Sequence, residues 1–114
     1  MKTLLAIPLI LLVAGCLTPP PPPPAPYRAL GTEPFWNVLI DQQHVTFIEP
    51  DQAQPLRQPR PTPVATAAVQ TYQTPRITVT ITRGTCSDGM SDRVYPDAVR
   101  VTVDGRQLSG CGGL

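Results

Sequence analysis

Two stretches of this chain alternate between branched apolar residues and polar residues, and this alternation constrains the fold more than any other feature. Residues 77–82 alternate isoleucine or valine with threonine, and residues 98–103 carry valine at every second position from 99. Side chains of a β-strand point to opposite faces with a period of two, so each stretch predicts a strand with one buried face and one solvated face. No segment places apolar residues at helical spacing over a helical length, and at most one helical turn fits after Ser87.

Two hairpins are predicted around these strands. Residues 35–40 and 44–49 flank a short polar turn at 41–43, which is typical of a hairpin. The dipeptide Asp104-Gly105 is a strong turn signal at the end of the 98–103 strand, and residues 106–110 would form the returning strand.

Residues 64–72 predict a weaker strand, and two other segments predict loops. Residues 50–63 contain five prolines and read as an exposed proline-rich loop, and residues 86–96 read as a second loop. The expected fold class is therefore all-β, a small antiparallel barrel or sandwich of about five to six strands.

Residues 1–15 are typical of a targeting segment. Lys2 precedes an apolar run over 4–13, which is shorter than the about 20 residues of a membrane span. The run ends in Val13-Ala14-Gly15-Cys16, which resembles the lipobox of bacterial lipoproteins. That resemblance implies a lipid on the thiol of Cys16, cleavage before it, and anchoring in a membrane. The alternative is an ordinary secretory peptide with a chance cysteine.

The residue after the cysteine and the following prolines refine this expectation. Leu17 rather than aspartate implies, by the sorting pattern of such lipoproteins, the outer membrane of a Gram-negative cell, with the domain facing the periplasm. Residues 16–26 would then be lipid anchor and polyproline spacer, holding the next domain roughly 25 Å from the bilayer. The alternative for the prolines is a ligand for an aromatic-lined groove.

Residues 27–114 form one small domain, which is marginally stable without a covalent link. Cys86 and Cys111 remain as an even pair once Cys16 carries lipid, and an oxidising compartment favours a disulfide between them. The alternative is two free thiols. From residue 16 onward the chain has eight arginines, eight acidic residues and no lysine. A basic patch is therefore not expected, and nucleic acid is a poor partner.

Residues 86–96, with the sequence CSDGMSDRVYP, carry the densest chemistry. Asp88, Asp92 and Asp97 offer oxygen ligands for calcium, but their spacing departs from the calcium loop of EF-hands. Zinc would need imidazole or free thiolates, and His44 is the only histidine. No metal and no cofactor are therefore predicted.

Catalysis and architecture are the other two readings of this segment. A serine nucleophile would have only His44 as base. Asp88 and Asp92 are a carboxylate pair of the kind used in sugar cleavage, but the sequence gives no signal of an apolar pocket around them. The architectural reading fits most residues, because Cys86 would fix the loop, Asp88 would accept backbone N–H groups, and Gly89 permits a positive φ.

Three motifs together resemble an uncharacterised family of small bacterial envelope proteins that are often lipoproteins. They are GTEPFW at 31–36, CSDGMSDR at 86–93 with Tyr95, and Gly110-Cys111. The resemblance implies an association with META-type or lysozyme-inhibitor-like (MliC-type) domains, and it implies no established activity.

If the first two motifs meet, charged and aromatic side chains would share one recognition surface. The candidate binding residues are Glu33, Trp36, Asp88, Asp92, Arg93 and Tyr95. The alternative places Trp36 and Phe35 in the core and pairs Glu33 with Arg93 internally.

The expected function is a lipid-anchored bacterial envelope protein with a non-catalytic β binding module. The membrane, through Cys16, and an envelope protein or cell-wall fragment are the expected partners. The alternatives are an inhibitor of a lysozyme-like hydrolase, a purely structural envelope lipoprotein, and a hydrolase that uses Asp88 and Asp92.

Overall fold

The computed structural model describes residues 3–6, 8–10, 15 and 18–114. The predicted lipidation site at Cys16 lies outside the described residues, as does much of the predicted targeting segment. The described residues contain nine strands. These are β1 Tyr27–Thr32, β2 Phe35–Ile40, β3 His44–Ile48, β4 Leu56–Pro59, β5 Val64–Ala65, β6 Val69–Gln73, β7 Ile77–Ser87, β8 Val94–Val103 and β9 Arg106–Gly112. Within that same part of the chain, no helix is long and apolar enough to span a membrane.

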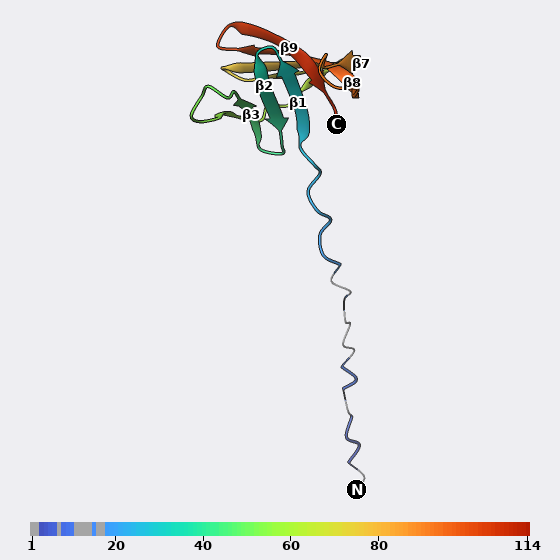
Figure 1. The fold of residues 1–114 in the computed structure, drawn as a ribbon. Coiled ribbons are helices and arrows are strands. Elements are labelled where there is room, and N and C mark those ends of the chain that lie inside the picture. Colours follow the sequence, from blue (N-terminus) through green and yellow to red (C-terminus); the bar gives the residue numbers. More distant parts are fainter. Residues whose placement is uncertain (1–2, 7, 11–14, 16–17) are drawn as a thin grey trace.

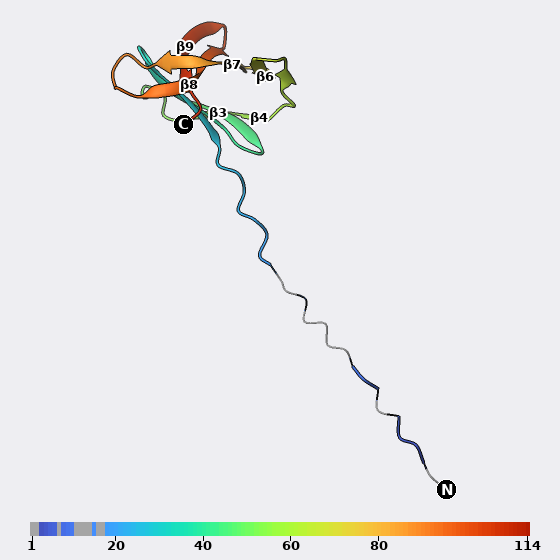
Figure 2. The ribbon, with the colours of Figure 1, turned by 90° about the vertical axis from the view of Figure 1, so that its right-hand side faces the viewer.

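All nine strands belong to one antiparallel sheet in the order β4-β3-β2-β1-β9-β8-β7-β6-β5. The chain steps outward from β1 to β4, crosses to the other edge through residues 60–63, and steps back from β5 to β9 (Figures 1 and 2). The first and last strands are therefore neighbours, joined in what we call the seam, the β1–β9 ladder. The sheet is a curled half-barrel that is continuous at the seam and open between β4 and β5.

The predicted all-β antiparallel fold and the Cys86–Cys111 disulfide are confirmed. The predicted strand number was too low, because the sheet has nine strands rather than five or six. The segment predicted as one strand over 64–72 forms β5 and β6 with a turn between them. Between β7 and β8, the described residues form no helical turn.

Strand β4 lies inside the segment predicted as a proline-rich loop, so that prediction is wrong for Leu56–Pro59. Proline is tolerated there because β4 is at the edge of the sheet and pairs only with β3. Strand β1 was also missed. Its buried positions hold Ala29 and Gly31, which do not produce the apolar alternation by which strands are recognised.

The core lies on the inner face of the half-barrel. Buried side chains alternate along β2, β7 and β8, as the period-two pattern predicts. The largest are Trp36 and Phe47, whose rings stack with centroids 6.4 Å apart. Figure 1 shows β1 and β2 crossing the layer formed by β7, β8 and β9, and the buried faces of both groups belong to one hydrophobic cluster.

Both predicted hairpins are confirmed. Strands β2 and β3 pair around Asp41, whose carboxylate accepts the N–H groups of Gln43 and His44 at 2.8 and 2.6 Å. Strands β8 and β9 turn at Asp104 and Gly105, which have φ of 48° and 85°. Two consecutive residues with positive φ are typical of the tight turn that suits the twist of a hairpin.

Candidate functional site

The seam between β1 and β9 has little hydrogen-bonded ladder of its own. Its register contains two residue pairs, Ala29 with Gly112 and Leu30 with Cys111. A further backbone bond joins the Gly113 N–H to the Arg28 carbonyl at 3.0 Å. Because the two halves of the sheet meet only here through strand pairing, other contacts must support the seam.

The indole of Trp36 supplies the first of these contacts. Its side chain is 1% exposed and lies across the backbone of β1 and β9. A Cβ atom added to Gly31 would lie 2.0 Å from the indole nitrogen, and one added to Gly110 would lie 2.7 Å from Cζ2. Glycine is needed at position 31 because the ring occupies the space of a side chain, and at position 110 because the Leu30 carbonyl oxygen, 1.9 Å from such a Cβ, and the ring both occupy it. Two of the three motifs singled out in the sequence therefore meet at this ring.

A disulfide supplies the second support. Cys86, near the end of β7, bonds to Cys111 in β9, with Cα atoms 5.6 Å apart. It fixes the start of the loop to the strand that forms the seam.

The third support lies at the other end of β1, where the Tyr27 hydroxyl donates to the Asp97 carboxylate at 2.8 Å. Burial, followed by this hydrogen bond to Asp97, raises the pKa of the Tyr27 phenol well above its usual range.

Asp88 organises the loop between β7 and β8. One carboxylate oxygen accepts the N–H groups of Met90 and Ser91 at 2.9 and 2.8 Å. The other accepts the hydroxyls of Ser91 and Tyr95 at 2.7 and 3.4 Å. The two backbone N–H groups are the main reason that the pKa of Asp88 falls to about 2, and the hydroxyls add to the effect. Asp88 is thus an ionised acceptor held by four donors.

The same residue ties the loop to the β1–β2 turn. The Thr32 hydroxyl donates to the Asp88 backbone carbonyl at 3.0 Å. A shallow groove of about 290 Å³ runs between the turn and the loop, and Glu33, Asp88 and the disulfide cysteines are among its lining residues. The expected meeting of GTEPFW with CSDGMSDR therefore occurs at this end of β1.

The candidate binding residues divide by exposure. Trp36 and Tyr95 are 1% and 5% exposed, so their side chains belong to the interior, as the alternative reading had it for Trp36. Glu33, Asp92 and Arg93 are exposed. The internal Glu33–Arg93 ion pair considered for this site is not formed. The ion pairs of the described residues are instead Arg76–Asp104 and Arg106–Glu49.

Three exposed apolar side chains accompany the exposed charges. Phe35 in β2, Met90 in the loop and Val94 in β8 are 54%, 67% and 63% exposed. We call residues 33–35 together with 89–94 the tip. The sequence analysis did not predict the exposure of these three side chains, and one reading placed Phe35 in the core beside Trp36. For Phe35 the strand periodicity gives the missing signal, since neighbours in a strand face opposite sides.

Among the described residues, no group of three histidine, cysteine or acidic side chains is arranged to hold an ion.

Comparison with protein-family models, curated proteins and solved structures finds no match to this chain.

Proposed function

We propose that this is a lipid-anchored cell-envelope protein whose β domain is a non-catalytic binding module, and that the tip is its contact surface for a protein partner. The observation that supports the proposal most is the exposure of Phe35, Met90 and Val94 on two segments that Thr32 and Asp88 tie together. Apolar anchors surrounded by charged groups are typical of protein interfaces. A surface held in place before binding also loses less entropy on association.

The direction of β1 supports the choice of the tip. The polyproline spacer joins β1 at Tyr27, and the tip lies beyond Thr32 at the other end of the strand. Six residues of strand span about 20 Å. A domain anchored through Cys16 would therefore present the tip at the end of β1 away from its anchor.

The hydrogen bonds around Asp88 disfavour this residue as the general acid of the hydrolase alternative. A general acid needs a carboxyl group whose pKa is raised, so that it carries a proton near neutral pH. The donors around Asp88 lower its pKa to about 2, which is the opposite direction. Asp88 is therefore unsuited to be the general acid of such a pair.

Inhibition of a lysozyme-like hydrolase is one specific form of the proposal, suggested by the association of the resembled family with lysozyme-inhibitor-like domains. The tip and its groove carry three carboxylates, from Glu33, Asp88 and Asp92, against one guanidinium from Arg93. This excess of negative charge would suit a partner with a basic surface.

A thermal melt of the full chain against a small panel tests the proposal. The panel holds a basic lysozyme, an acidic protein of similar size and soluble cell-wall fragments. A ligand at a hundred times its Kd adds about 2.7 kcal/mol, which for a domain of this size raises Tm by about 10 °C or more. We expect the basic protein to raise Tm.

The variants identify the surface. Phe35→Ser should abolish the shift, and Val64→Ser is the control because Val64 is also an exposed apolar side chain, at 71% against 54% for Phe35, but lies in β5. A shift that survives Phe35→Ser would contradict a role for the tip. No shift with any member of the panel would favour the structural lipoprotein.

A further inference from the structure

The outer face of the sheet from β6 to β9 carries a second candidate site. Its residues alternate with the buried isoleucines and valines of β7 and β8 and therefore point away from the core. Thr80 of β7 is in register with Arg100 of β8, and Arg100 is in register with Ser109 of β9. The hydroxyl and amide side chains of this face are Thr71, Gln73, Thr78, Thr80, Thr82, Thr102, Gln107 and Ser109.

Arg100 is the one charged side chain among these outward positions of the four strands. Its guanidinium forms none of the ion pairs found in the described residues, whereas Arg76 and Arg106 each hold a carboxylate. No acidic residue shares the outer rows on which Arg100 lies. A guanidinium in this setting has its hydrogen-bond donors free for an anionic ligand.

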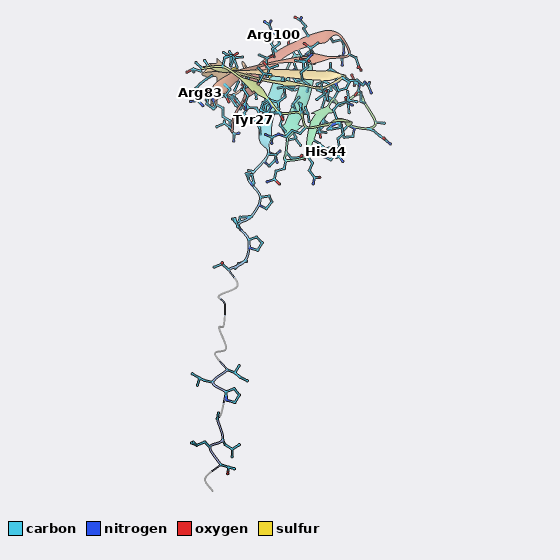
Figure 3. All side chains as sticks on the ribbon, turned by 180° about the vertical axis from the view of Figure 1, so that it is seen from behind. Tyr27, His44, Arg83 and Arg100 are labelled. Atoms are coloured by element: carbon cyan, nitrogen blue, oxygen red, sulfur yellow. A yellow bond between two sulfur atoms is a disulfide. The ribbon has the colours of Figure 1, made fainter. Side chains whose placement is uncertain are left out.

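The surface around Arg100 is hollowed. A shallow depression of about 430 Å³ is lined by Arg100 together with Thr80, Thr82 and Ser109. Figure 3 labels Arg100 on the side of β8 away from Tyr27, which reaches Asp97 on the inner side. The lining contains no aromatic side chain, which argues against a protein partner here.

We propose that this hydroxyl-rich face binds a glycan chain that bears carboxylate groups, with Arg100 as the anchor for one carboxylate. The planar guanidinium matches a carboxylate through two parallel hydrogen bonds. The surrounding threonine and serine hydroxyls can donate to and accept from sugar hydroxyls, in rows spaced about 4.8 Å apart across the strands. Ser109 and Gly110 line both this depression and the groove beside the tip, so the two sites are neighbours. Arg100 lies outside the tip, so the proposal does not depend on whether the tip binds a protein.

Isothermal titration of the full chain with oligogalacturonate tests the proposal, and its methyl ester is the neutral control ligand. We expect the acid form to bind and the ester to bind at least about tenfold more weakly. Arg100→Gln should reduce the affinity for the acid form by a similar factor, and a tenfold change corresponds to about 1.4 kcal/mol. Arg57→Gln in β4 is the matched control, because it removes one exposed guanidinium from a different part of the sheet. Thr80→Val should weaken binding while leaving the net charge unchanged.

Three results would overturn the proposal. The first is no binding of oligogalacturonate to the wild type. The second is an equal loss of affinity in the Arg57→Gln and Arg100→Gln variants, which would indicate only general charge attraction. The third is displacement of the glycan by equimolar inorganic phosphate, which would make the site one for a small anion and not for a sugar chain.

Discussion

The packing of Trp36 on Gly31 leads to a quantitative prediction about two substitutions. In Gly31→Ala the new Cβ would lie 2.0 Å from the indole nitrogen and 2.4 Å from Cε2, and all three of its nearest atoms belong to that ring. Overpacking of this kind costs about 1–3 kcal/mol, and we expect the upper end of that range. Trp36→Leu alone should cost about 3 kcal/mol, as large core truncations do.

The double variant should be more stable than the sum of these losses implies. Leucine at position 36 removes the ring atoms that the alanine methyl group would meet, so the penalty of Gly31→Ala should fall to below about 1 kcal/mol. The expected coupling is therefore about 2 kcal/mol in the compensating direction, well above the about 0.5 kcal/mol scatter of independent sites.

Urea unfolding of the four proteins measures this coupling. Far-UV circular dichroism is the suitable signal, because one partner of the cycle removes the only tryptophan of the chain. Gly84→Ala provides the matched control cycle, since a Cβ at that position meets no atom within 4 Å. Additive losses for Gly31→Ala and Trp36→Leu would refute the packing argument.

Three further predictions address the covalent links and the loop. Reduction of the Cys86–Cys111 bond, which closes a sequence separation of 25, should cost about 3.5 kcal/mol in the chain-entropy model and lower Tm by about 15 °C; an unchanged melt would contradict it. The pKa of Asp88 in the folded protein lies below its value in the unfolded chain, so its contribution to stability is present above about pH 4 and is lost as the pH falls toward about 2. In Asp88→Asn the free energy of unfolding should therefore depend less on pH over that window. A pH profile identical to that of the wild type would refute the assignment. Cys16→Ser should abolish acylation, and mass spectrometry that still detects acyl chains would exclude Cys16 as the anchor.

Much of the strand pattern follows from local rules. The alternation of isoleucine or valine with polar residues predicted the central parts of β7 and β8, and Asp104-Gly105 predicted the turn that joins β8 to β9. The predictions failed where a strand is defined by pairing with its neighbours and not by an apolar pattern of its own. Strand β7 continues to Ser87 beyond its last apolar residue, because it pairs with β8 again after an irregularity between Arg83 and Cys86.

The sequence predicted the charged residues of the candidate site, but not its exposed apolar residues or the burial of Trp36 and Tyr95. The motif residues do converge, as the sequence indicated for Glu33 and Asp88. Exposure depends on which face of a strand each side chain occupies. For Trp36 the alternation along β2 places the side chain on the buried face, but the space for its ring depends in part on Gly110 in β9, which no local pattern around Trp36 reveals.

Trp36 lies across the seam, and the loop motif and the disulfide hold this junction together. A nuclear Overhauser experiment on the oxidised full chain tests this arrangement most directly. We predict a strong cross-peak between the indole Hζ2 of Trp36 and the α-protons of Gly110. A well-resolved spectrum with no such cross-peak would contradict the account, because the ring would then lie elsewhere and the seam would lack its main packing contact.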